Sequence, residues 1–361
     1  KSLNIAHVST PKSWRGGEQQ LAYLFAELLK LNQNQILIVN KNSELSNYAK
    51  ANNWKHFGLN IRSSISLGFA KNIAKICREN HISILHPHDS KAHTQCILAH
   101  VFFNCKTPIV LSRRVDYPIS KSFFSKYKYN HPAIKAIICV SDAIKKIMQK
   151  DITNKNILHT VYDGIDINKF HFGKSNQIRN EFNIKDDELL IANIAAISEQ
   201  KDYFTFVNAA ELLINGGIKA KFIIFGDGPL KEKITEFVNQ KKLNNSILFA
   251  GFRNNIPEIL PQIDYLLFSS QNEGLGSSIL DAFCAKVPVV ATEIGGIPEL
   301  IKHKETGLLA PVKSPKLLAD QIKFYINNPE LKKEIIENAF QFSRNFTYQK
   351  MAEETLKVYL S

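Results

Sequence analysis

The segment from Ser270 to Asp281 combines two carboxylates with glycines and serines, in the order Ser-Gln-Asn-Glu-Gly-Leu-Gly-Ser-Ser-Ile-Leu-Asp. Its glycine-bearing part consists of Gly274, Leu275, Gly276 and Ser277. Backbone amides at the start of a helix bind phosphate groups, because they point at the anion and the positive end of the helix dipole lies there. A helix that begins near Ser277 would therefore hold a diphosphate. Asp281 would accept hydrogen bonds from ribose hydroxyls, and Glu273 from the hydroxyls of a sugar.

The same two carboxylates allow two other interpretations. Glu273 and Asp281 would act as the acid and base of a hydrolase only if they flanked one scissile bond. In the purely structural interpretation, Asp281 interacts favourably with the helix dipole and Glu273 is a solvated surface residue.

Three further turns between an expected strand and an expected helix also carry glycines. They contain the pairs Gly16 and Gly17, Gly226 and Gly228, and Gly295 and Gly296. Glycine lets the backbone approach a ligand without a Cβ atom in the way, so these turns are candidates for an anion site, although each also fits an ordinary tight turn. The first turn lacks the complete G-x-G-x-x-G fingerprint, so dinucleotide binding is not supported.

Two arginines, Arg113 and Arg114, follow another expected strand and precede Asp116. Either guanidinium group could bind a phosphate through two parallel hydrogen bonds, or hold an anionic acceptor. The alternative is a surface ion pair with Asp116, which would contribute little to stability.

Histidines gather where a further strand is expected to end, at His86 and His88, with His93 beyond them. Alternate residues of a strand point to the same face, but Pro87 argues against a strand that continues through this segment. No cysteine or further carboxylate completes a tetrahedral ligand set. We therefore expect no metal site here, and we expect His88 to line a cleft and orient an acceptor hydroxyl.

Short β-branched runs, each followed by a stretch with helical periodicity, indicate parallel strands joined by helices. The expected strands are 3–10, 35–40, 82–88, 108–114, 136–141 and 158–162 in the first half, and 189–197, 221–226, 247–252, 265–270, 287–292 and 307–311 in the second. This pattern predicts an α/β fold with two similar doubly wound sheets. Apolar residues spaced by three and four between Phe346 and Tyr359 predict a closing helix.

The length of 361 residues fits two domains of roughly 150 to 200 residues each. We place the linker near 163–173, where turn residues occur without a clear period. The expected division is a first domain at 1–165, a second at 166–345, and a C-terminal helix at 346–361 that packs back towards the first domain.

The composition, with 44% hydrophobic and 22% charged residues, is that of an ordered globular protein. No run approaches about 18 uninterrupted apolar residues, so a spanning helix is not expected, nor is a signal peptide; we expect a cytoplasmic protein. The five cysteines show no C-x-x-C spacing and are expected to be buried thiols. The formal charge of +13 favours anionic partners, but no motif that reads nucleic acid accompanies it.

Taken together, these motifs resemble the retaining glycosyltransferases of family 4, which have the GT-B fold of two Rossmann-like domains. The resemblance is carried by the acidic pair Glu273 and Asp281 in E-x7-E spacing, by 288–292, 295–299 and 306–309, by Asp163-Gly164-Ile165-Asp166, and by Gly16 with Gly17. It covers nearly the whole chain, with the first domain matched mainly by pattern.

The resemblance implies transfer, with retention, of a sugar from a nucleotide-diphosphate sugar to a glycan or lipid-linked glycan, as in bacterial surface-polysaccharide or lipopolysaccharide synthesis. The second domain would hold the donor and the first the acceptor. The implied donor-binding residues are Gly16, Gly17, Gly226, Gly228, Phe252, Arg253, Gly274, Leu275, Gly276, Ser277 and Asp281. The implied catalytic residues are Glu273, Lys201, Arg114 and His88. No metal ion or other cofactor is expected.

Individual roles follow from the same resemblance. Phe252 and Arg253 would lie beside the base, and Lys201 would neutralise charge on the departing diphosphate. Ala196 stands where the family has an arginine, so one charge-assisted contact worth roughly 1.5–3 kcal/mol is missing or is supplied by Arg113 or Arg114. Asp281 replaces the usual glutamate, and the two arginines stand where many relatives have a histidine.

Two other functions remain open at this point. One is an epimerase or phosphorylase with the same fold, and the other is a non-catalytic protein that binds nucleotides or glycans. The basic charge also suits peripheral association with the anionic inner face of the cytoplasmic membrane.

Overall fold

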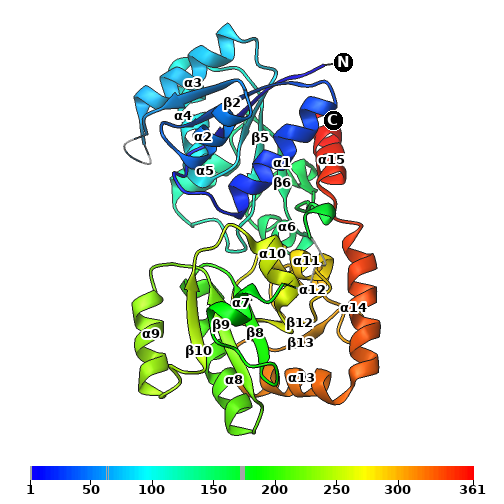
Figure 1. Cartoon of the computed structure of the whole chain (residues 1–361). Coiled ribbons are helices and arrows are strands. Elements are labelled where there is room, and N and C mark those ends of the chain that lie inside the picture. Colours follow the sequence, from blue (N-terminus) through cyan, green and yellow to red (C-terminus); the bar gives the residue numbers. More distant parts are fainter. Residues whose placement is uncertain (1, 62, 64, 171–174) are drawn as a thin grey trace. The chain divides into compact units, whose positions relative to one another are not determined.

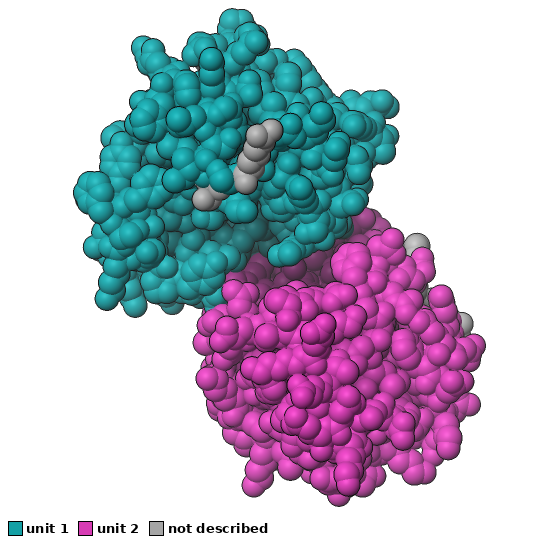
Figure 2. Space-filling view, turned by 90° about the vertical axis from the view of Figure 1, so that its left-hand side faces the viewer, with its two compact units in different colours: residues 1–164, 348–361 teal, residues 165–347 magenta. Residues whose placement is uncertain are grey.

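The computed structural model describes residues 2–61, 63, 65–170 and 175–361 (Figure 1). The chain forms two compact units: unit 1 comprises Lys1–Gly164 and Tyr348–Ser361, and unit 2 comprises Ile165–Thr347 (Figure 2). The chain thus leaves unit 1 after Gly164 and returns to it after Thr347, close to the boundaries expected at 165 and 345. Part of the expected linker, 171–173, lies outside the described residues.

Unit 1 is built on a parallel sheet of seven strands in the order β3-β2-β1-β4-β5-β6-β7. The strands are β1 (Asn4–Ser9), β2 (Asn34–Asn40), β3 (His56–Leu59), β4 (Ile84–Pro87), β5 (Ile109–Arg113), β6 (Ile134–Cys139) and β7 (Leu158–Thr160). Its helices are α1 (Gly16–Lys30), α2 (Glu44–Ala51), α3 (Leu67–Glu79), α4 (Ser90–Phe103), α5 (Phe123–Tyr129), α6 (Asp142–Met148) and α15 (Tyr348–Leu360), with a 3₁₀ turn η1 (Lys155–Ile157).

The expectation of six strands in the first half was wrong by one strand, β3. This strand has only four residues, pairs with β2 at the edge of the sheet, and has no buried residue. It therefore lacks the apolar run by which the other strands were recognised.

The closing helix α15 belongs to unit 1 and packs against α1 (Figure 1). Leu24 and Leu28 of α1 lie in one buried cluster with Met351 and Ala352 of α15. The rings of Tyr23 and Tyr348 stack with centroids 5.1 Å apart. The spacing of three and four residues predicted this helix because it marks the side that is buried.

Unit 2 is built on a parallel sheet of six strands in the order β10-β9-β8-β11-β12-β13. The strands are β8 (Leu189–Ile194), β9 (Ala220–Phe225), β10 (Ile247–Gly251), β11 (Tyr265–Phe268), β12 (Val289–Thr292) and β13 (Leu308–Ala310). Its helices are α7 (Gln177–Glu181), α8 (Tyr203–Asn215), α9 (Lys231–Gln240), α10 (Ile256–Ile259), α11 (Ser277–Cys284), α12 (Ile297–Leu300), α13 (Pro315–Asn327) and α14 (Pro329–Ser343), with 3₁₀ turns η2 (Ile167–Lys169), η3 (Glu199–Lys201) and η4 (Leu260–Gln262).

The core of unit 2 lies between its sheet and the helices α8 and α13. Phe206, Phe222, Ile224 and Leu267 are fully buried there, together with Tyr325. All six strands of this unit were predicted, and their near-continuous apolar runs reflect burial on both faces. The core holds the carboxyl ends of the strands in fixed positions, and the loops with chemistry-bearing residues follow those ends.

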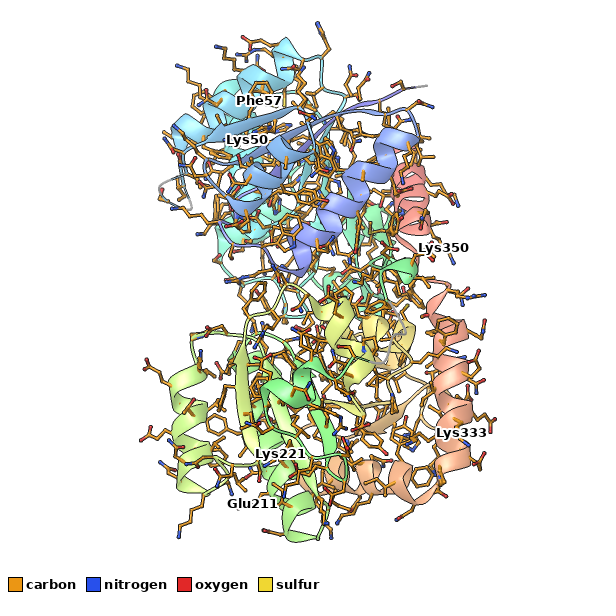
Figure 3. All side chains as sticks on the ribbon, viewed as in Figure 1. Lys50, Phe57, Glu211, Lys221, Lys333 and Lys350 are labelled. Atoms are coloured by element: carbon orange, nitrogen blue, oxygen red, sulfur yellow. The ribbon has the colours of Figure 1, made fainter. Side chains whose placement is uncertain are left out.

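The cysteines and the charged side chains are distributed as the composition predicted. All five cysteines are free and buried, which confirms their interpretation as buried thiols. Charged side chains cover both units, and exposed lysines such as Lys50, Lys333 and Lys350 are labelled in Figure 3. In the part of the chain that the structure describes, no helix has the length and apolar character needed to span a membrane.

Candidate active site

The loop between β11 and α11 presents the predicted diphosphate-binding segment at the carboxyl end of the unit 2 sheet. Gly276, the residue before α11, has a φ of +92°, in the left-handed region that favours glycine. A Cβ atom there would lie 3.1 Å from Cδ1 of Ile279. The residue before α11 is a glycine and supplies no capping side chain, and the amide of Ile279 donates to the carbonyl of Gly276 at 2.8 Å. The amides of Ser277 and Ser278, in the first turn of the helix, have no acceptor within the helix and can bind an anion.

Lys201 and Glu273 form an ion pair beside this loop. Lys201 ends the turn η3 after β8, and its Nζ atom contacts a carboxylate oxygen of Glu273. The side chains are only 17% and 13% exposed, so neither charge is fully hydrated. The hydroxyl of Ser270 lies 3.4 Å from the same carboxylate oxygen. The two residues predicted from separate segments to act on sugar and diphosphate therefore lie together.

The neighbouring turn after β12 fixes the backbone of this loop. The hydroxyl of Thr292 donates a hydrogen bond to the carbonyl of Ser270, and the amide of Gly296 donates one to the carbonyl of Glu273 at 3.1 Å. The hydroxyl of Ser269 donates to the carbonyl of Lys201 at 2.9 Å. Three segments at the strand ends are thus connected through backbone groups, which limits the movement of Lys201 and Glu273.

The glycines after β9 have a packing role that the sequence did not reveal. A Cβ atom on Gly226 would lie 2.0 Å from the carbonyl oxygen of Ala195, and one on Gly228 would lie 2.4 Å from that of Ile197. The backbone after β8 therefore occupies the space that these glycines leave open. Their lack of a side chain is explained by this close approach, and a direct contact with a ligand stays a prediction.

Asp281 has a cationic partner that sequence analysis missed. The Nζ atom of Lys169, in the turn η2, lies 2.8 Å from Oδ1 of Asp281, with the side chains 23% and 21% exposed. Lys169 closely follows the Asp163-Gly164-Ile165-Asp166 motif, but its distance from Asp281 in the sequence gave no signal of the pair. The lysine compensates the negative charge of Asp281 and restrains its rotamer beside the diphosphate-binding loop.

The predicted base-binding residues follow β10. Phe252 is 65% exposed, so its ring face is accessible for stacking. Arg253 pairs with Glu181 of α7 and donates from Nε to the carbonyl of Ala250 at 3.1 Å. Ala196, which replaces the arginine of the resemblance, is exposed in the turn after β8.

In unit 1, Arg114 forms an ion pair with Asp163. Its Cδ atom lies 4.0 Å from where a Cβ atom of Gly17 would stand, so Arg114 packs beside the start of α1. The side chain of Gln20 donates to the carbonyl of Gly164 at 2.8 Å and accepts from its amide at 2.9 Å. Gln20, another residue the sequence analysis missed, thereby attaches the end of the Asp163-Gly164 segment to α1.

Arg113 and Arg114 differ in burial and in hydrogen-bond partners. Arg113 is buried, and its guanidinium group donates to the hydroxyl of Tyr129 at 2.8 Å and to the carbonyl of Tyr117. Arg113 is therefore a buried residue whose side chain points towards α5. Arg114 is the more accessible of the two, with a side chain that is 20% exposed.

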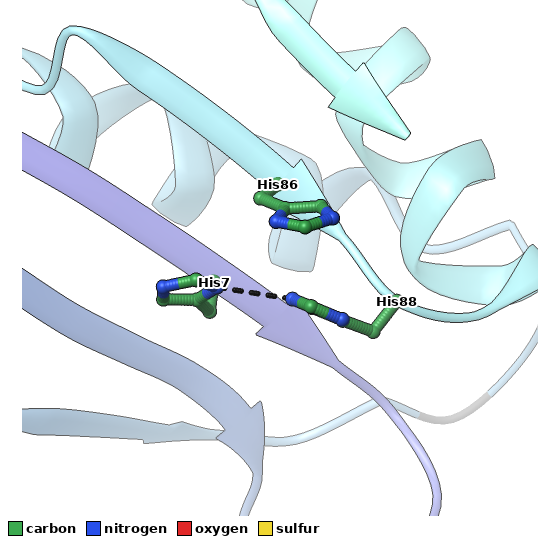
Figure 4. A group of neighbouring side chains, drawn as sticks. All are labelled: His7, His86 and His88. Atoms are coloured by element: carbon green, nitrogen blue, oxygen red, sulfur yellow. Dashed lines mark hydrogen bonds between the residues drawn. The ribbon is translucent and has the colours of Figure 1, made fainter. Parts of the chain in front are cut away.

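The histidine cluster is more compact than the sequence indicated (Figure 4). The strand β4 continues through Pro87, and the rings of His86 and His88 lie side by side with centroids 4.0 Å apart. Pro87 is the last residue of β4, but the two rings are adjacent nonetheless, so the argument from Pro87 against a shared face was wrong. His7 of β1, which sequence analysis did not consider, joins them because β1 and β4 are neighbours in the sheet, and its Nδ1 lies 3.0 Å from Nε2 of His88.

Burial keeps these imidazole rings neutral. It lowers the pKa of His7 to about 4 and holds the pKa values of His86 and His88 well below the ordinary value. One nitrogen from each ring lies within 4.8 Å of the others, so the set has the spacing of a metal site. However, both nitrogens of His86 are bonded to Tyr359 and Ser112, and the facing nitrogens of His7 and His88 bond each other. These hydrogen bonds account for the cluster, and the expectation of no metal stays a prediction.

The structure thus groups the predicted residues into two sets. In unit 2, Lys201, Glu273 and the start of α11 lie together. In unit 1, Arg114 lies beside Gly17, and His88 belongs to the histidine cluster. Backbone and side chains at the carboxyl ends of parallel strands form both sets, as expected for ligand sites in such sheets.

Two parallel sheets with these sets at their strand ends define the GT-B fold, which has two Rossmann-like domains. The crystal structure of Anabaena HepE in complex with UDP and glucose aligns with 98% of this chain and 98% of that chain, with a TM-score of 0.86 and 18% identity. At this identity the likeness establishes the fold.

The sequence comparisons give the family. Residues 14–169 match the family described as Glycosyltransferase Family 4, and residues 174–342 match Glycosyl transferases group 1. The chain belongs to the family 4 glycosyltransferases. The N-acetyl-alpha-D-glucosaminyl L-malate synthase of Bacillus anthracis is 25% identical over 80% of this chain and 76% of its own length. The O-antigen biosynthesis glycosyltransferase WclY of Escherichia coli is 29% identical over 57% and 55%.

Proposed function

We propose that this glycosyltransferase moves a sugar from a nucleotide-diphosphate sugar to a hydroxyl of a glycan or lipid-linked glycan, with retention at the anomeric carbon. The observation that carries the proposal is the Lys201–Glu273 pair beside the uncapped start of α11. This arrangement offers a cation and helix amides to a diphosphate, and a carboxylate to sugar hydroxyls, within one loop cluster.

The donor part of the proposal is supported by unit 2. The amides from Leu275 to Ser277 would hold the diphosphate, Asp281 the ribose, and the ring of Phe252 the base. UDP bound to HepE supports a nucleoside diphosphate as the ligand class. No metal is required in this proposal, because Lys201 and the helix dipole supply positive charge to the leaving group.

The transfer step balances without a protein nucleophile. The bond between the anomeric carbon and the β-phosphate oxygen breaks, and the acceptor hydroxyl forms the new bond on the same face of the sugar. The departing diphosphate takes the hydroxyl proton, so the products are a glycoside and a nucleoside diphosphate. Lys201 stabilises the charge that grows on the phosphate oxygens as the bond breaks.

A donor screen tests this proposal. Wild-type protein is incubated with α-configured UDP-, GDP- and dTDP-sugars, with and without a lipid-linked oligosaccharide acceptor. We expect release of nucleoside diphosphate that depends on the acceptor, and a product with an α linkage by NMR. Release that is equal without acceptor, or a β-linked product, would contradict acceptor transfer or retention respectively.

We further propose that unit 1 docks on an anionic bilayer through α5, which would bring the enzyme to lipid-linked acceptors. Phe123 is 86% exposed, and Phe124 and Tyr127 are also exposed on this short helix. Lys121 and Lys126 flank these rings and are exposed as well. Exposed aromatic rings beside lysines are typical of surfaces that lie at the boundary between lipid head groups and acyl chains.

Vesicle sedimentation tests this docking surface. We expect wild-type protein to sediment with phosphatidylglycerol vesicles at low salt and much less at high salt or with phosphatidylcholine. Phe123→Ser combined with Phe124→Ser should abolish sedimentation. Phe102→Ser is the matched control, because Phe102 is 61% exposed on α4 of the same unit. Equal loss in the control, or none in the double variant, would refute the assignment to α5.

A further inference from the structure

A chain of buried hydrogen bonds links α1 to His88 through β2 and β1. The side-chain amide of Gln35 donates to the carbonyl of Phe25 at 2.9 Å. The side-chain oxygen Oε1 of Gln35 lies 3.0 Å from Nε2 of His7, and Nδ1 of His7 lies 3.0 Å from Nε2 of His88. Gln35, His7 and His88 are 7%, 0% and 9% exposed, so water has little access to any of these bonds.

The backbone carbonyl of Phe25 determines which group donates in each hydrogen bond from Gln35 to His88. This oxygen can only accept, so Gln35 must present its NH₂ group to Phe25 and its oxygen to His7. His7 must then carry its proton on Nε2, which leaves Nδ1 with a lone pair. His88 must donate to that lone pair from Nε2. Since burial lowers the pKa values of both imidazoles, each ring has one proton, and Nδ1 of His88 is left as an acceptor.

Nδ1 of His88 is an acceptor that no described residue uses. Among the residues that the structure describes, Nδ1 of His88 is buried and has no hydrogen-bond partner. The adjacent ring of His86 cannot supply a proton, because its two nitrogens are bonded to Tyr359 and Ser112. A buried acceptor without a partner carries a desolvation cost, and this cost is removed when a ligand donates a hydrogen bond.

The backbone around His88 is as firmly held as its ring. The amide of His88 donates to the carbonyl of Val8 at 2.9 Å. The next residue, Asp89, caps α4 through the amides of Lys91 and Ala92 and also accepts from the amide and hydroxyl of Thr10. His88 therefore has a defined position just after β4, at the carboxyl ends of the strands, where ligands bind in such sheets.

We propose that Gln35 and His7 are positioning residues that fix His88 in the Nε2–H tautomer, so that its Nδ1 accepts a hydrogen bond from a hydroxyl of a sugar substrate. The ligand class is a sugar, because under the proposed function sugar hydroxyls are the donors supplied, and a hydroxyl can donate to a neutral imidazole nitrogen. This inference rests on the proposed sugar transfer. It adds that the proton position on His88 is determined by a glutamine on β2.

The tautomer is measured directly by long-range ¹H–¹⁵N NMR of protein labelled with ¹⁵N-histidine, with His88 assigned through His88→Gln. We expect wild-type His88 to be protonated on Nε2 only. Gln35→Leu removes the acceptor for His7 and should give a mixture of tautomers at His88. Gln35→Glu can still accept from His7 and should restore the single tautomer.

Gln33→Leu is the matched control for the loss of a buried glutamine. The side chain of Gln33 accepts from the amide of Leu3 and donates to the carbonyl of Leu31 in the same region, without contact to His7. We expect Gln35→Leu to lower kcat/KM for the acceptor about tenfold, the loss expected for one hydrogen bond, and Gln33→Leu to leave it within twofold. Both variants should lose similar thermal stability.

The outcomes test the positioning role of Gln35 and His7 separately from the proposed sugar transfer. Protonation of wild-type His88 on Nδ1, or an unchanged His88 spectrum in Gln35→Leu, overturns the positioning role. Full acceptor kcat/KM in Gln35→Leu overturns the hydroxyl contact even if the tautomer changes. Absence of transfer by the wild type refutes the proposed function, and the NMR result still decides whether Gln35 and His7 set the tautomer.

Discussion

At the scale of single residues, the central feature is the pairing of Lys201 with Glu273. Both side chains are mostly buried, so each charge depends on the other for compensation. A diphosphate bound beside Lys201 would interact with the same ammonium group as Glu273. The ion pair thus holds Lys201 in position for the leaving group. The pair is therefore expected to matter more for turnover than for folding.

Replacement of either partner tests this expectation. Lys201→Ala and Glu273→Gln should each reduce turnover by about 100-fold or more, because one electrostatic contact to the developing charge or to the donor sugar is lost. The matched control is Lys241→Ala, which breaks a pair with Glu211 of similar exposure in the same unit. Steady-state kinetics should show the control within twofold of wild type. Turnover within twofold in Lys201→Ala would contradict the assigned role.

The neutral histidines predict a particular dependence of stability on pH. The folded state lowers the pKa of His7 to about 4 because the ring is buried, whereas the unfolded chain has a value near 6.5. The unfolded state therefore binds more protons below pH 6.5, so stability is lost as pH falls from about 6.5 towards 4.

For His7 alone the loss is roughly 2 kcal/mol at pH 5. Urea denaturation at pH 7, 6 and 5 should show this decline, and His7→Gln should make the decline shallower. A pH dependence in His7→Gln as steep as that of wild type would show that His7 is not the source.

Residue types predicted several members of the site but not their partners. Glu273, Asp281 and His88 were predicted because carboxylates and histidines follow expected strands, whereas Lys201 was predicted only from the family resemblance. Lys169, the partner of Asp281, and His7, the partner of His88, lie far away in sequence. The second pair forms because β1 and β4 are neighbours in the sheet. Gln35 gave no signal, since a glutamine in a strand has no distinctive pattern.

At the scale of elements, the start of α11 depends on the backbone of Gly276. Gly276→Ala should destabilise the protein by roughly 1–2 kcal/mol, because an alanine disfavours the left-handed conformation. It should also weaken donor binding, since the first amides of α11 change direction.

Gly217→Ala is the control that separates loss of stability from loss of donor binding. Gly217 has a φ of +83° with open space around it, away from the site, so it should lose similar stability and keep full activity. Thermal unfolding and calorimetric titration with a nucleoside diphosphate measure the two quantities. Equal nucleotide affinity in wild type and Gly276→Ala would contradict the role of α11.

The helix α15 should stabilise unit 1 through Tyr359 as well as through apolar packing. Its hydroxyl shares a hydrogen bond with Nδ1 of buried His86. Tyr359→Phe should cost about 1 kcal/mol, measured by urea denaturation, because that nitrogen loses its partner. Leu360→Ala, at a position 60% exposed on the same helix, should be nearly neutral. An equal effect of both changes would indicate that the hydrogen bond contributes nothing.

Elements were easier to predict than their ends. Strands buried on both faces appear as apolar runs, which is why all strands of unit 2 were found. The edge strand β3 was missed because its residues are not buried. Expected strands such as 189–197 ran past the true end at Ile194, because the apolar residues Ala195 and Ile197 belong to the turn that packs on Gly226 and Gly228.

At the scale of the whole molecule, each unit has its own core, and the chain passes between the units after Gly164 and after Thr347. The fold class followed from alternating strands and helices, and the family from motifs concentrated in the second half. The identity of base, sugar and acceptor did not follow, because it depends on side chains brought together by loops of differing length.

A crystal structure of the chain with a bound nucleoside diphosphate would show directly whether the β11–α11 loop is the donor site. We predict the diphosphate within hydrogen-bond distance of the backbone amides from Leu275 to Ser277 and of Nζ of Lys201, with the ribose hydroxyls at Asp281. A fully occupied nucleotide that contacts none of these groups would contradict this prediction.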